Sequence, residues 1–119
     1  MTVNPINTEV QNLLRDAQSL LARLKDAPGD AASAAADDVL LFCYRLRDGY
    51  RIVRSSSKQF GGPTFSFLNG LLYELESSPD ETMRSVEWRS VMENLLQALA
   101  TGAIVVQSNA TFSSLRNRP

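Results

Sequence analysis

The absence of histidine and the presence of only one cysteine limit the chemistry that this chain could perform. None of the 119 residues is histidine, and Cys43 is the single cysteine. Without histidine the chain lacks the usual partner of a serine or cysteine nucleophile, and one cysteine cannot complete a structural zinc site. Cys43 falls on an apolar face at helical spacing, which predicts a buried, unreactive thiol. The residue types therefore predict no metal site, no cofactor and no enzymatic activity.

Two other patterns have chemical potential. Asp80 and Glu81 are adjacent carboxylates, but they follow a Ser-Pro pair, as acids often do in the first turn of a helix. Ser55 and Lys58 have the Ser-x-x-Lys spacing in which a lysine can deprotonate a serine nucleophile. The Ser-Asp-Asn and Lys-Thr-Gly motifs that accompany this spacing are absent. We therefore expect a protein that acts by binding.

The stretch between Arg45 and Lys58 is more basic than an ordinary protein surface. It contains five basic residues and a single acid. On a helix, four of these residues and one aromatic residue would form a continuous basic ridge: Tyr44, Arg47, Arg51, Arg54 and Lys58. Leu41 and Ile52 would project from nearly the opposite side of the same helix to its core residues. These residues together are the predicted partner-binding set.

Three interpretations of the basic ridge are open at this point. Its arginines can pair with the stretch from Glu74 to Glu93, where six acids accompany two arginines. The ridge can instead bind another protein with an acidic or mixed acidic and apolar surface, because arginine and tyrosine are frequent interface anchors. The alternative partner is a nucleic-acid backbone, which the formal net charge of −1 disfavours.

These considerations favour a small protein-binding module, such as an adaptor, chaperone, regulator or inhibitor. Because the helix that carries the basic ridge would have apolar groups on two faces, we expect it to contact a second copy in a homodimer or another component of a complex. With one cysteine and no disulfide framework, we expect a reduced, cytoplasmic setting. The first nine residues do not have the pattern of a secretion signal.

The elements that must position these residues are predicted to be helices. Apolar residues recur three and four positions apart in segments at about 8–27, 31–58, 63–77 and 79–108. Ser78-Pro79, followed by acids, marks the start of the last segment. Residues 109–119 are predicted to form a short polar tail. The predicted fold class is all-α, a compact single-domain bundle of about four helices.

One segment of the last predicted helix is ambiguous. Ile104-Val105-Val106 has the composition of a short strand, but one strand without an evident mate would leave its backbone groups unpaired, so we predict a helix there. The most apolar stretch, from Leu95 to Val106, is far shorter than the roughly 20 residues needed to span a bilayer. We therefore expect it in the core and expect no membrane contact.

Overall fold

The apolar stripe near the start of the chain forms the longest helix, α1 (Pro5–Lys25). Leu13, Ala17 and Leu24 on this stripe are completely buried. The structure is a computed structural model that describes residues 5–25, 29–60 and 64–109. The predicted first helix is therefore present, although its predicted end at residue 27 lies outside the described residues. Neither α1 nor any other helix of the described ranges is long and apolar enough to cross a membrane.

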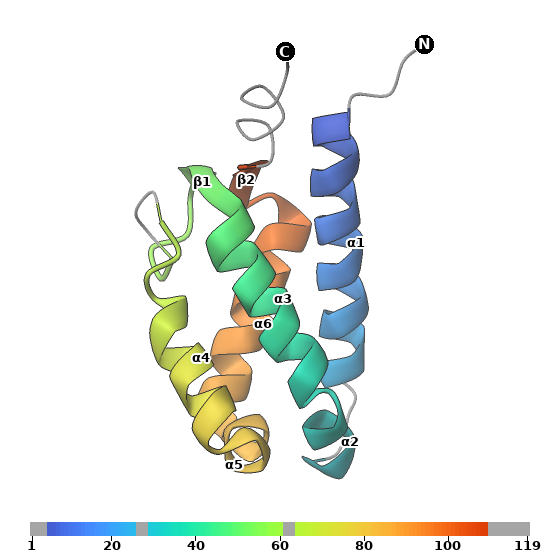
Figure 1. The fold of residues 1–119 in the computed structure, drawn as a ribbon, viewed down its shortest axis with the longest axis vertical. Coiled ribbons are helices and arrows are strands. Elements are labelled where there is room, and N and C mark those ends of the chain that lie inside the picture. Colours follow the sequence, from blue (N-terminus) through green and yellow to red (C-terminus); the bar gives the residue numbers. More distant parts are fainter. Residues whose placement is uncertain (1–4, 26–28, 61–63, 110–119) are drawn as a thin grey trace, which may run out of the picture.

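The described elements form a mostly helical globule with a small sheet at one end. In chain order they are α1, α2 (Gly29–Ala34), α3 (Ala36–Gly49), β1 (Tyr50–Ser55), α4 (Leu68–Ser77), α5 (Pro79–Arg84), α6 (Val86–Thr101) and β2 (Ile104–Ser108). Figure 1 shows α3 on the near side with α6 behind it, and α1 and α4 to either side. The predicted helical fold is thus confirmed in outline, with two strands added.

The largest departure from the prediction is segment 31–58, which is not one helix. Helix α3 ends at Gly49, and the chain continues from Tyr50 as strand β1. Its first residues alternate between buried and exposed, as a strand with one covered face requires. β1 pairs with β2 in antiparallel order, with Tyr50 opposite Ser108. Strand β1 therefore holds two of the five residues that were expected on a helical ridge, Arg51 and Arg54.

The predicted continuation of the last helix to residue 108 is also wrong, because Ile104–Ser108 forms strand β2. Its mate is β1, which the helical interpretation of segment 31–58 concealed. Backbone hydrogen bonds extend the pairing beyond both strand ends. The Ser56 N–H donates to the Ala103 carbonyl at 2.8 Å, and the Asn109 N–H donates to the Gly49 carbonyl at 2.7 Å. Each strand therefore satisfies the backbone groups along the facing edge of the other, which removes the objection that β2 would have no mate.

The other predicted helices are shorter than expected. Helix α4 begins at Leu68, not at residue 63. The last predicted helix is split at Ser85, whose side chain accepts a hydrogen bond from the backbone N–H three residues later and caps α6. Pro79 does begin a helix, α5, as predicted, although Ser78 makes no side-chain capping bond. Only the first residue of the predicted tail at 109–119 lies in the described part.

The core confirms most of the inward-facing residues that the helical periodicity predicted. Five predicted core residues around α4 are buried: Phe65, Leu68, Leu71, Leu72 and Leu75. Met92, Leu95 and Leu99 on α6 are buried in the same cluster. Phe67 is partly buried, with its ring centre 4.9 Å from that of Phe60. Spacing therefore identified the core well even where the ends of the helices were misplaced.

Gly102 redirects the chain from α6 into β2, and its replacement by alanine tests this turn. Its φ of +82° lies in the left-handed region, at the C-terminal cap of α6. No atom lies within 4 Å of the position that a Cβ would take, so the backbone conformation alone sets the effect. Gly102→Ala is expected to lower the free energy of unfolding by about 1 kcal/mol in urea denaturation.

Gly70→Ala is the matched control for this prediction. Gly70 lies inside α4 without a positive φ, and an added Cβ would make ordinary contact with Trp88 at 3.7 Å. Because glycine costs free energy inside a helix, this change is expected to raise the free energy of unfolding by about 0.5 kcal/mol. If both variants change stability in the same direction, the left-handed turn at Gly102 is not the determinant.

Candidate interaction surface

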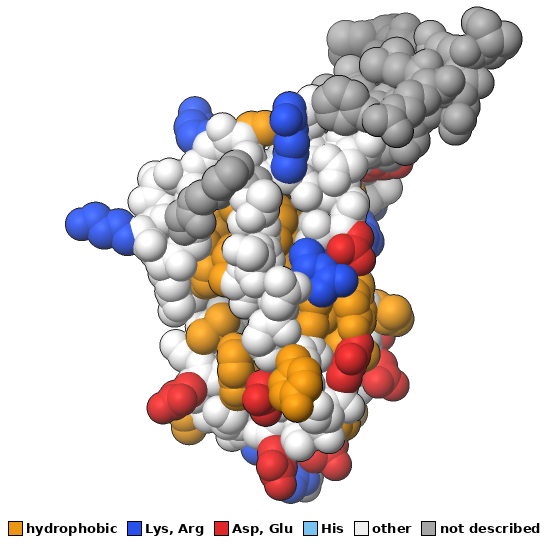
Figure 2. All heavy atoms as spheres, turned by 60° about the vertical axis from the view of Figure 1, so that its left-hand side comes forward, with side chains coloured by type: hydrophobic (Ala, Val, Ile, Leu, Met, Phe, Trp, Pro, Cys, Tyr) orange, Lys and Arg blue, Asp and Glu red, His pale blue; other side chains and the backbone are white. Residues whose placement is uncertain are grey.

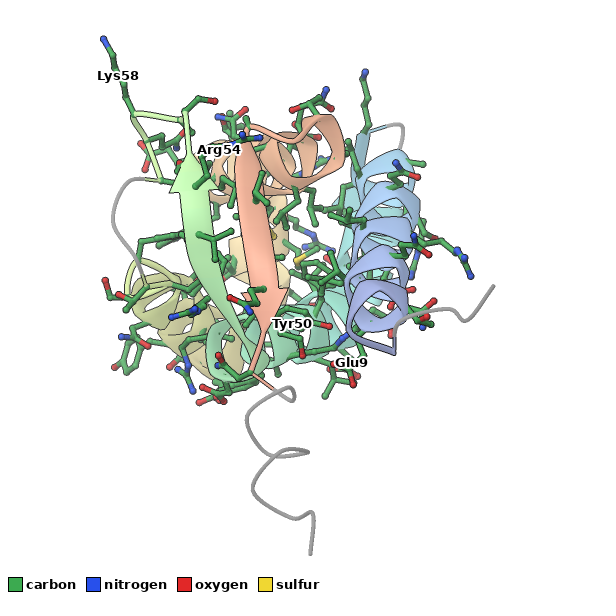
Figure 3. The ribbon with its side chains drawn as sticks, turned by 90° about the horizontal axis from the view of Figure 1, so that it is seen from above. Glu9, Tyr50, Arg54 and Lys58 are labelled. Carbon is green, nitrogen blue, oxygen red and sulfur yellow. The ribbon has the colours of Figure 1, made fainter. Side chains whose placement is uncertain are left out.

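Strand β1 and the turn after it place three of the predicted basic residues at the sheet end of the molecule. Arg51 and Arg54 are exposed on β1, and Lys58 is exposed in the following turn. Figure 3 shows Arg54 and Lys58 toward one end of β1, with Lys58 extending away from the molecule. We refer to Arg51, Val53, Arg54 and Lys58 as the sheet-end surface.

A bulge in β1 determines which side chains belong to this surface. The pairing register shifts between Ile52 and Arg54, which makes Val53 an inserted residue. With strict alternation, Arg54 would share the buried face of Tyr50 and Ile52. With the insertion, Arg54 is exposed and Val53 is 50% exposed. The bulge therefore turns Arg54 outward beside Val53, which strict alternation would also expose.

The three basic side chains of the sheet-end surface differ in their contacts. Arg51 donates two hydrogen bonds, at 2.8 and 3.3 Å, to the side-chain oxygen of Gln107, which lies opposite it on β2. Arg54 and Lys58 make no ion pair with any residue in the described part of the chain. Internal pairing with the acids of residues 74–93 therefore does not account for these two.

Tyr44 and Arg47 lie on α3 and form a separate group. The Arg47 guanidinium lies 5.0 Å from the centre of the Tyr44 ring, 2.9 Å from the Asp48 carboxylate and 2.9 Å from the Asn69 side-chain oxygen. The hydrogen bond from Arg47 lowers the pKa of Asp48 below its ordinary value. The predicted continuous basic ridge is wrong, because α3 ends between Arg47 and Arg51.

The two apolar residues of the predicted partner-binding set lie in different environments. Leu41 on α3 is 66% exposed, which confirms its predicted outward position. Ile52 is 7% exposed and belongs to the core cluster together with Tyr50. The outward prediction for Ile52 is wrong because a rotation of about 100° per residue does not apply to a strand, in which alternate residues share a face.

On the face that Figure 2 shows, side chains of opposite charge gather toward opposite ends. Figure 2 shows lysine and arginine side chains mainly in its upper half and acidic side chains mainly in its lower half. Figure 1 places α5 at the end opposite the sheet. The acids near that end come from α4, α5 and the first turn of α6: Glu74, Glu76, Asp80, Glu81 and Glu87. On this face the electrostatic potential is therefore more positive toward the sheet end, although Arg84 also lies on α5 and Glu9 and Asp48 line a pocket beside the sheet.

A polar pocket between the start of α1 and the sheet was not indicated by any sequence pattern. Its volume is about 440 Å³, and its lining includes Glu9, Asp48, Tyr50 and Ser108. The buried Ser108 hydroxyl donates to the Glu9 carboxylate, and the Tyr50 hydroxyl donates to the Glu9 carbonyl oxygen at 3.2 Å. Figure 3 shows Tyr50 and Glu9 close together. Ser108 and Glu9 are 99 positions apart, so local spacing carries no signal of the pocket.

The candidates for chemistry have little catalytic character in this arrangement. Cys43 is buried, as predicted, and desolvation raises its pKa to about 12, so the thiol is protonated at neutral pH. The Ser55 hydroxyl donates to the Phe60 carbonyl oxygen at 3.0 Å, which directs its proton to the backbone and not to Lys58. Within the described ranges, no three His, Cys, Asp or Glu side chains gather as metal ligands.

Comparisons with known proteins do not identify a relative. The chain matches no protein-family model, no curated protein and no solved structure. The surface features that can recognise a partner are the exposed basic residues of the sheet-end surface and the exposed Leu41 on α3.

Proposed function

We propose that this protein is a non-enzymatic protein-binding module that binds an acidic segment of a partner through the sheet-end surface. The observation that carries the proposal is that Arg54 and Lys58 are exposed without an ion pair to any described residue, close in the chain to the half-exposed Val53. A basic surface around an apolar side chain suits a partner with carboxylates and an apolar anchor. An adaptor, chaperone, regulator or inhibitor would act in this way.

Electrostatics would contribute mainly to the rate and selectivity of this binding. On the face that Figure 2 shows, the positive charge of the sheet-end surface would attract an acidic segment, while the acids of α4 and α5 would repel it. Salt screens such attraction beyond about 8 Å at physiological ionic strength. Contact of an apolar partner residue with Val53 would then supply a contribution that salt does not remove.

The double variant Arg54→Glu, Lys58→Glu tests this proposal. It is expected to weaken binding to a fluorescent peptide of alternating glutamate and leucine about tenfold or more, because two attractive contacts become repulsive. Fluorescence anisotropy at several salt concentrations measures the dissociation constants. Arg15→Glu with Lys25→Glu on α1 is the control, because both residues are exposed and the net charge changes equally.

The comparison of the two variants distinguishes binding through the sheet-end surface from a general effect of net charge. Retained binding in the control and loss in the sheet-end variant would support the proposal. Equal weakening in both variants, or no binding by the wild type, would contradict it. A single-stranded oligonucleotide serves as the competitor for the alternative partner. Tighter binding of the oligonucleotide, with a steep dependence on salt that the sheet-end variant abolishes, would replace the protein partner by a nucleic acid.

A further inference from the structure

Helices α1 and α3 run in opposite directions (Figure 1). Side chains of both helices line a groove. The groove has a volume of about 300 Å³. Its lining includes the buried side chains of Leu20 and Phe42, while Leu41, also in the lining, is 66% exposed. The groove therefore exposes an apolar side chain on the outer surface of α3, where no described residue covers it.

Two ion pairs cross this groove and are arranged with approximate twofold symmetry. Arg23 of α1 lies 2.7 Å from Asp38 of α3, and Arg45 of α3 lies 2.6 Å from Asp16 of α1. Each helix thus carries an aspartate followed seven positions later by an arginine. All four side chains are between one-third and two-thirds exposed, so the pairs contribute little to the stability of a monomer. They remain accessible to a partner.

The outer surface of α3 is electrostatically complementary to itself. Asp38 precedes Leu41 by three positions, and Arg45 follows it by four, so both lie on the same helical face as Leu41. When two such helices pack antiparallel with a twofold axis close to Leu41, midway between positions 41 and 42, Asp38 of each copy lies opposite Arg45 of the other. The two Leu41 side chains meet close to the axis. One symmetric contact would therefore pair opposite charges and bury the exposed leucine.

The other strongly exposed apolar side chains on helices, Tyr73 and Val86, do not have this property. Val86 is 83% exposed but is the first residue of α6, so charges of that helix cannot flank it on both sides. Tyr73 on α4 is 68% exposed, but α4 contains Glu74 and Glu76 and no basic residue. Antiparallel packing of α4 against a second α4 would offer these acids no opposite charge to pair with. The charge pattern therefore singles out α3 as the face that suits a second copy of this chain.

We propose that the protein forms a homodimer through the α1–α3 groove face, with the two α3 helices antiparallel and Leu41 close to the twofold axis. This dimer does not depend on the proposed function, because its contact residues are separate from the sheet-end surface. Since α3 runs toward the sheet, antiparallel packing places the two sheet-end surfaces at opposite ends of the dimer. A dimer of this form presents two binding surfaces at once.

Charge complementation at the axis tests the dimer. Leu41→Arg and Leu41→Glu are each expected to weaken self-association at least tenfold, because like charges meet at the axis. An equimolar mixture of the two is expected to recover association, because arginine then meets glutamate. Sedimentation equilibrium measures the dissociation constants. Both variants should fold, since position 41 is exposed, and circular dichroism checks this. The controls Tyr73→Arg and Tyr73→Glu should dimerise like the wild type.

Several results would contradict the proposed dimer. A wild type that is monomeric at its highest soluble concentration, or a Leu41 mixture that associates no better than either variant alone, would overturn the proposal. A spin label on Leu41→Cys gives a second measurement, because the native Cys43 is buried and unreactive. Two labels at the axis should give an interspin distance limited by the label arms, whereas labels on Tyr73→Cys should lie farther apart. A shorter interspin distance for labels on Tyr73→Cys than for labels on Leu41→Cys would also exclude this interface.

Discussion

Replacing Ile52 with aspartate is expected to lower the free energy of unfolding by about 4 kcal/mol or more. Ile52 is 7% exposed in the core, so the change removes a buried apolar side chain and places a carboxylate where water cannot solvate it. A domain of this size is typically stable by only about 5 to 15 kcal/mol. The variant is therefore expected to be largely unfolded or close to it.

Val53→Asp is the control. Comparing it with Ile52→Asp tests whether this segment is a strand or part of a helix. Val53 is the next residue along β1 and is 50% exposed, so the change is expected to cost about 1 kcal/mol or less. A continuous helix over 31–58 predicts the opposite order, with Val53 in the core and Ile52 outward. Urea denaturation, monitored by the fluorescence of Trp88, the single tryptophan, distinguishes the strand from the continuous helix. Greater damage from Val53→Asp would contradict the sheet.

The thiol of Cys43 is expected to react with a maleimide about a thousandfold more slowly in native protein than in urea at pH 8. Burial raises its pKa from 9.0 to about 12, which lowers the thiolate fraction by roughly that factor. Steric protection adds to this effect. Tyr73→Cys in a Cys43→Ala background supplies an exposed thiol as the control. A native Cys43 that reacts within tenfold of this control would contradict the buried position.

The same pKa shift predicts a dependence of stability on pH. Because the folded pKa lies above the unfolded one, the thiol's contribution is complete below about pH 9 and is lost as the pH rises toward 12. At pH 10 the expected loss is about 1 kcal/mol. Because other side chains also ionise at alkaline pH, the quantity to compare is the difference in the free energy of unfolding between the wild type and Cys43→Ala. A constant difference between pH 8 and pH 10.5 would exclude the shift.

Periodicity predicted those elements whose apolar residues are buried against neighbours along a whole helix. The stripe of α1 is present, and the residues from Phe65 to Leu75 that were expected inside are buried. The Ser78-Pro79 pair marks the start of α5 as expected, because proline fits the first turn of a helix whatever surrounds it. Such signals are local, so the sequence alone carries them.

The sheet could not be predicted in this way because each strand depends on the other. Ile104–Ser108 has too few residues to form a stable strand alone, and its mate lies more than forty positions earlier in the chain. Tyr50 to Ser55 also fits a helical stripe when it is viewed without that mate. The two errors are therefore one error: assigning the first strand to a helix removed the partner of the second. Pairing between distant segments has no signature within either segment.

For the candidate binding residues, too, the sequence showed local properties but not the arrangement in space. Their types and their concentration between Arg45 and Lys58 were visible in the sequence, and so was the outward position of Leu41 on a true helix. Their geometry was not visible. Arg47 lies on α3, Arg54 lies beyond a bulge on β1, and their side chains belong to different surfaces.

By itself the sequence determined that this protein is mostly helical, which apolar residues form most of its core and that histidine-based chemistry is unavailable. These properties follow from composition and from spacing along single helices. Only the tertiary structure decided that the chain leaves the helix at Gly49, pairs Tyr50–Ser55 with Ile104–Ser108 and turns Arg54 outward. The physical reason is that a strand obtains its backbone hydrogen bonds from another segment, whereas a helix obtains them from itself.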